Sequence, residues 1–145
     1  MNAALPELDF ADVVQPAWNV SPRVRALVTT RNGGVSDAPF GRWRDGADQP
    51  GGLNLGMKSG DDPAAVASNR ARLLALAGVG EAAWLEQIHG AGIVRAEDVL
   101  AQAHADGTPT RADASVTDRA GTVCVVLVAD CMPVLLCDAA GRAVG

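Results

Sequence analysis

Hydrophobic residues are concentrated in short runs, and the strongest of these lies near the end of the chain. Residues 122–128, TVCVVLV, are almost all β-branched or aliphatic, a composition typical of a buried strand. The run meets Ala-Asp-Cys-Met-Pro at residues 129–133, where Pro133 cannot donate a ladder hydrogen bond. We therefore expect a central strand over residues 122–129, with Asp130 and Cys131 at its polar end.

One helix is predicted with both of its ends defined. Asp62 is a favourable N-cap residue, Pro63 suits the first helical position, and Gly78 is typical of a C-terminal stop. We expect the helix to run from Pro63 to Ala77 and to pack on one side of the sheet. Apolar residues mark the buried side of this helix: Val66, Leu73, Leu74 and Ala77.

The remaining pattern predicts short strands joined by loops. Strand candidates are residues 24–30, which end in an Asn-Gly-Gly turn at 32–34, and residues 84–89, WLEQIH. Residues 37–52 form a loop that is long for a compact domain and rich in Gly, Pro and Asp. The other predicted segments are an irregular start at 1–22, a short helix and loop within 95–112, and a hairpin turn at 138–142. Together these elements predict an α+β fold, with a mixed β-sheet and flanking helices in layers, forming one domain.

Composition and charge narrow the class of protein. Of the 145 residues, 48% are hydrophobic and 20% are charged, which is typical of a globular domain. A formal charge of −5 and few aromatic side chains argue against a protein dedicated to nucleic acid. We find no apolar run of membrane-spanning length, no signal peptide, and no CxxC spacing among three cysteines. We therefore expect a cytoplasmic protein with reduced thiols and with neither a membrane nor a nucleic acid as partner.

Few side chains are clear candidates for chemistry on residue type alone. His89 and Cys131 each stand at the end of a predicted strand, and a lone residue of either type is more often structural than catalytic. Arg31 precedes the glycine turn, where a plain surface position and an anion-binding role are about equally compatible with the sequence. Asn69 and Arg70 lie off the centre of the apolar side of the predicted helix and, taken alone, are expected to be solvated.

A set of ordered motifs resembles one protein family. The motifs are TTRNGGVS at 29–36, NLG at 54–56, GDDP at 60–63, NR at 69–70, QIHG at 87–90, ADA at 112–114 and ADCMP at 129–133. They occur in the order found in the laccase-domain family, whose members have been called multicopper polyphenol oxidase, peptidoglycan editing factor and purine nucleoside phosphorylase. Each motif is weak by itself, but together, over about residues 24–145, they are specific.

The resemblance implies a zinc site. In the family, the histidine of QxHG and the cysteine of ADC, here His89 and Cys131, bind zinc together with a histidine of an HAGWR-type motif. That motif is missing up to Gly145, so the resemblance implies an N-terminal portion of a longer enzyme, with the third ligand beyond Gly145. Zinc is preferred to copper because it needs three protein ligands, whereas the copper centres of an oxidase need more imidazoles than two histidines supply. The loop at 41–52 exceeds the usual family spacing.

The resemblance also implies an activity. It is that of a zinc-dependent purine nucleoside phosphorylase, which converts adenosine, inosine, guanosine or methylthioadenosine and phosphate to the free base and ribose 1-phosphate, and which also deaminates adenosine. Arg31 or Arg70 is the candidate phosphate-binding group. Asp113 and Asp130 either orient the metal ligands or cap local structure.

Other hypotheses stay open at this point. Cys131 and His89 form a nucleophile–base pair in a second hypothesis, that of a hydrolase acting on amide bonds, for instance in peptidoglycan precursors. The older family name implies a polyphenol oxidase. In a further hypothesis the chain by itself is an inert folding domain, and the sequence does not define the oligomeric state.

Overall fold

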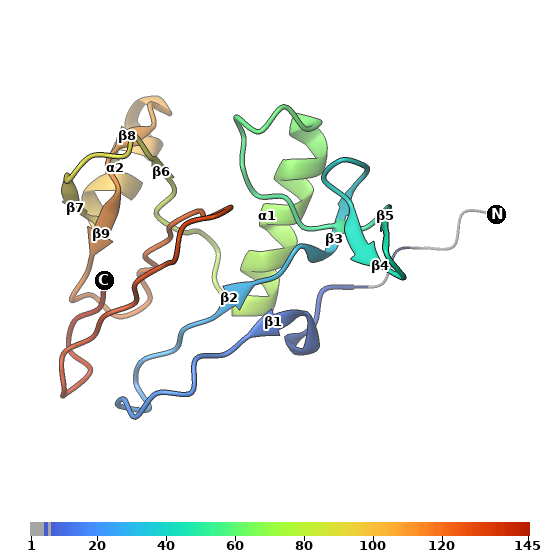
Figure 1. The fold of residues 1–145 in the computed structure, drawn as a ribbon. Helices are drawn as coiled ribbons and strands as arrows, with labels where there is room; N and C mark the ends of the chain where they lie inside the picture. Colours follow the sequence, from blue (N-terminus) through green and yellow to red (C-terminus); the bar gives the residue numbers. More distant parts are fainter. Residues whose placement is uncertain (1–4, 6) are drawn as a thin grey trace. The chain divides into compact units, whose positions relative to one another are not determined.

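A computed structural model of the chain describes Leu5 and residues 7–145, and its contacts divide the chain into two compact units (Figure 1). The first unit comprises the described residues up to Ala17 together with Leu27–Gly80, and the second comprises Trp18–Ala26 and Glu81–Gly145. The expectation of one domain stays a prediction. None of the described helices is long and apolar enough to cross a membrane.

Short strands and two α-helices make up both units and confirm the predicted α+β class. The elements of the first unit are η1 (Phe10–Asp12), β1 (Val13–Val14), β2 (Val28–Thr29), β3 (Asn32–Ser36), β4 (Arg42–Arg44), β5 (Ala47–Gln49) and α1 (Pro63–Ala77). Those of the second unit are β6 (Leu85–Glu86), β7 (Ile93–Arg95), α2 (Ala96–Asp106), β8 (Thr110–Arg111) and β9 (Ala114–Val116). The paired strands form four two-stranded sheets, two antiparallel in the first unit and two parallel in the second.

Helix α1 has the predicted bounds because its capping signals are local. The Asp62 carboxylate accepts a hydrogen bond from the backbone N–H of Ala64 at 3.0 Å, and Pro63 occupies the first helical position. Gly78 ends the helix in the left-handed conformation with a φ of 70°. The helix lies along β3 (Figure 1), and Val66 is buried on it, with 1% of its surface exposed.

The expected solvation of Asn69 and Arg70 is wrong. Asn69 is 0% exposed, and Arg70 is partly buried. The buried side of α1 is therefore centred on Val66 and Asn69, while the other residues expected there are only half-buried: Leu73, Leu74 and Ala77. The buried side of α1 differs from the predicted one because β3 offers polar backbone groups to which a buried amide can hydrogen-bond.

The expected turn at residues 32–34 is instead the start of strand β3. The two glycines serve close packing as well as backbone freedom. A Cβ atom at Gly34 would lie 2.1 Å from the carbonyl oxygen of Gly52 and 2.4 Å from Oδ1 of Asn69. A side chain at this position cannot be accommodated, so the chain segments meet here through bare backbone.

The segment expected to be a loop at 37–52 contains the antiparallel hairpin of β4 and β5. Its two-residue turn is formed by Asp45 and Gly46, with φ values of 54° and 76°. An Asp-Gly pair with both residues at positive φ is typical of a tight hairpin turn. The signal for this hairpin was therefore present in the sequence.

The strand expected over residues 24–30 is shortened to β2. Its partner is β1, in which Val13 pairs with Thr29, so the start of the chain is not irregular throughout as expected. These segments exchange few ladder hydrogen bonds because each strand is only two residues long.

In the second unit, β7, α2 and β9 form a parallel β-α-β arrangement, and β6 pairs in parallel with β8. The strand predicted over 84–89 is thereby limited to Leu85 and Glu86. The small core of this unit consists of Ala83, Leu85, Ala96, Val99 and Ala112.

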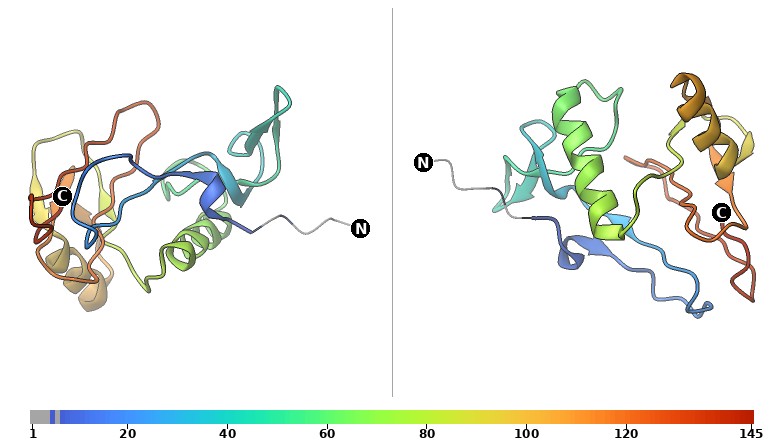
Figure 2. Two further views of the ribbon diagram at one scale, coloured as in Figure 1. Left: turned by 90° about the horizontal axis from the view of Figure 1, so that it is seen from below. Right: turned by 180° about the vertical axis from the view of Figure 1, so that it is seen from behind.

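The predicted central strand at 122–129 is wrong. Only Cys124 of this run is in a β-bridge, with Ala83, and Figures 1 and 2 draw the run as extended chain without a strand arrow. A side chain takes the backbone groups of Leu127 that a neighbouring strand would otherwise use, because Gln87 donates to its carbonyl and accepts from its N–H. Within the described residues, no strand pairs with the other edge of this run. Its composition indicated β structure correctly, but a strand needs partners that composition does not reveal.

The predicted hairpin turn at 138–142 is confirmed. The Asp138 carboxylate accepts hydrogen bonds from the side chain and backbone of Arg142 and from the backbone N–H of Ala143. The Arg142 side chain is the main reason why the pKa of Asp138 falls from 3.8 to about 2.

This turn gives a prediction for acid stability. Because the folded pKa of Asp138 lies below its unfolded value, the stabilisation is present above pH 3.8 and is lost as the pH falls toward about 2. Side-chain carboxyl NMR titration should give a pKa of about 2 for Asp138, and Asp138→Asn should flatten the acid limb of an unfolding curve. A titration midpoint at the ordinary aspartate value would contradict the structure.

Candidate functional site

The predicted zinc ligand His89 lies in a loop with a defined geometric origin. Strands β6 and β7 precede and follow this loop, residues 87–92, and both pair with the single run 110–116, β6 through β8 and β7 through β9. The run changes partner at Ala112 and Asp113, whose backbone N–H groups donate to Glu86 and Gly92 at 3.2 Å each. The loop therefore lies beside the point at which the run 110–116 stops pairing with β6 and begins to pair with β7.

Asp113 holds this loop through its side chain. Its carboxylate accepts hydrogen bonds from the backbone N–H groups of Ile88 at 3.0 Å, His89 at 2.8 Å and Gly90 at 2.8 Å. The bond from Gly90 contributes most to lowering the pKa of Asp113, with further contributions from the other two. Asp113 therefore caps this loop, and its role in orienting a metal ligand stays a prediction.

His89 itself has an unusual backbone. Its φ is 57°, one of only two positive values at non-glycine positions in the described chain, and its side chain is exposed. Left-handed residues other than glycine are uncommon and are unfavourable unless their surroundings hold them. The imidazole is therefore presented from a constrained loop rather than from a strand.

Cys131 follows the extended run of the same unit. The Gln87 side-chain amide donates to the carbonyl of Leu127 at 2.9 Å and accepts from its N–H at 2.7 Å. These two hydrogen bonds join the two segments at positions two residues before His89 and four residues before Cys131. The Cys131 thiol is exposed and free, so both side chains are open to a ligand.

The donor set in the described residues is limited. No group of three or more His, Cys, Asp or Glu side chains in this part of the chain is placed to hold a metal ion. Imidazole and thiolate are ligands that zinc prefers, so His89 and Cys131 fit two of the three protein ligands of a catalytic zinc site by their chemistry.

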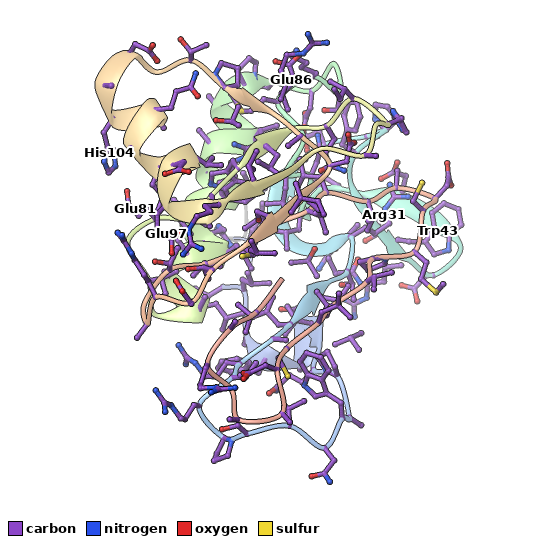
Figure 3. The ribbon with its side chains drawn as sticks, turned by 90° about the vertical axis from the view of Figure 1, so that its left-hand side faces the viewer. Arg31, Trp43, Glu81, Glu86, Glu97 and His104 are labelled. Atoms are coloured by element: carbon purple, nitrogen blue, oxygen red, sulfur yellow. The ribbon has the colours of Figure 1, made fainter. Side chains whose placement is uncertain are left out.

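The two predicted phosphate ligands lie in the first unit and make structural contacts there. Arg31 donates through Nε to the carbonyl of Gly41 at 2.6 Å and through Nη2 to Pro39 at 3.1 Å and Asp48 at 3.2 Å, and so it braces the base of the β4–β5 hairpin (Figure 3). Arg70 donates through Nε to the carbonyl of Leu55 at 2.9 Å, and burial lowers its pKa. Their role toward phosphate stays a prediction.

Asn69 is a structural centre that sequence reasoning missed. Its Oδ1 accepts from the backbone N–H of Val35 at 2.8 Å. Its Nδ2 donates to the hydroxyl of Ser36 at 2.9 Å and to the carbonyls of Gly52 at 3.2 Å and Asn54 at 2.9 Å. One buried amide thus connects α1, β3 and the segment after the hairpin, and only its presence in the NR motif could have drawn attention to it.

The network extends to the carboxylate before α1. Asp61 accepts from the hydroxyl of Ser36 at 2.6 Å and from the amide of Asn54 at 3.0 Å. Burial by itself would raise the pKa of Asp61, but the hydrogen bonds from Ser36, Asn54 and the backbone of Asp62 outweigh it and lower the pKa. Motif residues of the first unit therefore form a network of hydrogen bonds that connects α1, β3 and the segment after the hairpin.

Comparisons with solved structures identify the fold. The crystal structure of a Neisseria meningitidis protein matches with a TM-score of 0.74 and 39% sequence identity, covering 92% of this chain and 48% of that chain. The structure of YlmD from Geobacillus stearothermophilus matches with a TM-score of 0.53 and 30% identity, covering 77% of this chain and 42% of that chain. A sequence profile of the multi-copper polyphenol oxidoreductase laccase family matches residues 25–145. The chain belongs to this family, which confirms the resemblance drawn from its motifs.

Related proteins of known name are similar over most of this chain. A purine nucleoside phosphorylase of Pseudomonas aeruginosa is 41% identical over 129 residues, which cover 89% of this chain and 46% of that protein. The purine nucleoside phosphorylase YfiH of Escherichia coli is 40% identical over 136 residues, which cover 93% of this chain and 49% of that protein. The chain spans about half the length of the curated relatives that it matches.

Proposed function

We propose that the protein acts as a purine nucleoside phosphorylase, cleaving a purine nucleoside with phosphate to the free base and ribose 1-phosphate. The observation that carries this proposal is the identity of about 40% to proteins named purine nucleoside phosphorylase over nearly the whole chain. Adenosine, inosine, guanosine and methylthioadenosine are the proposed substrates, and deamination of adenosine is a proposed second activity. The three free cysteines are in keeping with a reducing, cytoplasmic compartment.

Zinc is the proposed cofactor, with His89 and Cys131 as two of its protein ligands. The exposed side chains of both residues and the constrained backbone of His89 support this assignment. When bound, zinc would supply Lewis-acid chemistry and a bound water of lowered pKa. The chain's own contribution is to hold an imidazole and a thiol on two segments that Gln87 ties together.

A direct assay tests the activity. Purified protein is incubated with adenosine in phosphate buffer and in a phosphate-free buffer, and the products are separated by liquid chromatography. We expect adenine and ribose 1-phosphate only when phosphate is present, and inosine in both buffers. If adenine and ribose 1-phosphate do not form with zinc supplied, the phosphorylase proposal is wrong for this chain, and if inosine does not form, the proposed deamination is wrong.

A second candidate is the amide hydrolase with Cys131 as nucleophile and His89 as base. The exposure of the Cys131 thiol favours it, because a nucleophile must be reached by its substrate. The two candidates differ in how metal affects the thiol. Alkylation of Cys131 by iodoacetamide that is unchanged by added zinc favours the hydrolase, whereas protection by zinc favours the phosphorylase.

A further inference from the structure

We propose that Asp113 is a positioning residue, whose carboxylate holds the loop at 87–92 in the conformation that presents the His89 imidazole to its ligand. The inference rests on the proposed function only in taking His89 as a metal ligand. The hydrogen bonds from the loop to Asp113 involve only residues of the described chain, so the conformation of the loop and the binding of zinc can be tested separately.

The geometry of the hydrogen bonds requires a carboxylate. Oδ1 of Asp113 accepts from both Ile88 and His89, and Oδ2 accepts from Gly90. Three donors therefore converge on two acceptor oxygens. An asparagine has one acceptor oxygen and an NH₂ group that cannot accept, so it can keep the bonds to Ile88 and His89 but not the bond from Gly90.

The bonds act on the loop and not on a hydrophobic core. Ile88 is 44% exposed, and His89 and Gly90 are exposed as well. Little apolar burial would therefore order residues 88–90 without Asp113. Three charge-assisted bonds to successive N–H groups are stronger than neutral ones and are suited to keep His89 in its left-handed conformation.

The position of Asp113 in the fold explains why it can do this. Its backbone lies where the run 110–116 changes partner from β6 to β7, opposite the loop, and its own N–H is engaged by the carbonyl of Gly92 at 3.2 Å. Main chain and side chain of one residue thus contact both ends of the turn that contains His89. A residue further along the run would face a strand instead of the loop.

The test compares Asp113→Ala and Asp113→Asn with wild type and with Asp98→Ala, an exposed carboxylate in α2 of the same unit. The first readout is NMR of the metal-free protein, in which the backbone shifts and the HN–Hα coupling of His89 report its φ. The second is titration with Co²⁺ alone, followed by the thiolate-to-cobalt absorption band that reports Cys131.

We expect Asp113→Ala to lose the left-handed signature of His89 and to weaken Co²⁺ binding about 10- to 100-fold, the usual effect of removing a partner that orients a metal ligand. Asp113→Asn should lie between Ala and wild type, and Asp98→Ala should match wild type. If Asp113→Ala does not fold, the His89 NMR signals and the Co²⁺ affinity of Asp113→Asn, compared with those of wild type, still test the proposal.

Two results would overturn the proposal: unchanged His89 signals in both Asp113 variants, or altered signals with Co²⁺ affinity equal to wild type. Failure of the wild-type protein to bind Co²⁺ would instead count against the zinc assignment, and the NMR comparison would then decide the hold on the loop by itself.

Discussion

Asn69→Ala is expected to lower the free energy of unfolding by about 3–4 kcal/mol, because it leaves three buried or partly buried backbone groups without this hydrogen-bond partner. The amide accepts from the N–H of Val35 and donates to the carbonyls of Gly52 and Asn54, and Asn69 itself is 0% exposed. Urea unfolding followed by circular dichroism would measure the change.

Two further variants make this test specific. Asn69→Asp keeps an acceptor for Val35 but places a carboxylate near two carbonyl oxygens, so we expect it to be at least as destabilising as alanine. Ser68→Ala changes the exposed neighbour in α1 and should stay within about 0.5 kcal/mol of wild type. Equal stability of Asn69→Ala and Ser68→Ala would show that the network does not stabilise the fold.

His89→Ala and Cys131→Ala are each expected to abolish zinc binding and to lower kcat/KM for adenosine phosphorolysis by at least about 1000-fold, equivalent to about 4 kcal/mol of transition-state stabilisation. Each variant removes one of the two proposed ligands that this chain supplies. Metal content by mass spectrometry and steady-state kinetics with a fixed phosphate concentration are the measurements.

The chain offers a matched control for each ligand. His104 is the other histidine, and it lies exposed on α2, where its Nε2 is 2.6 Å from a carboxylate oxygen of Glu81 (Figure 3). His104→Ala should retain zinc and activity, as should Cys137→Ser. Full activity of His89→Ala alongside full activity of His104→Ala would remove His89 from the site.

The sequence predicted those features of the fold that depend only on neighbouring residues, such as the two ends of α1. The bounds of α1 followed from Asp62, Pro63 and Gly78, whose capping geometry involves only neighbouring residues. The Asp-Gly turn of the β4–β5 hairpin was equally local, and it was available in the sequence although the segment was expected to be a loop.

Features that depend on distant partners could not be predicted in this way. The burial of Asn69 depends on backbone groups 15–34 positions away in the chain, and periodicity along a helix contains no such information. Gly33 and Gly34 resembled a turn because glycine suits turns, but Gly34 is required by the close approach of Gly52. The apolar run before Cys131 was expected to be a central strand, although its pairing depends on segments that composition does not identify.

The candidate site shows the same division. His89 and Cys131 were singled out by resemblance to a family, since each alone is an ordinary residue. The contacts of Asp113 and Gln87, which determine how the His89 loop is held, became visible only when the run 110–116 and the segment containing Leu127 were placed beside the loop.

The location of the Asn69 network has a consequence for how such chains are recognised. Four of the signature strings, from NGGVS through NLG and GDDP to NR, contain residues whose observed hydrogen bonds assemble the first unit. A descendant that had lost its histidine and cysteine would still carry these strings, would still fold, and would still be assigned to the family by sequence. If the proposed zinc site is correct, catalytic competence is better judged from QIHG, ADA and ADC than from overall similarity.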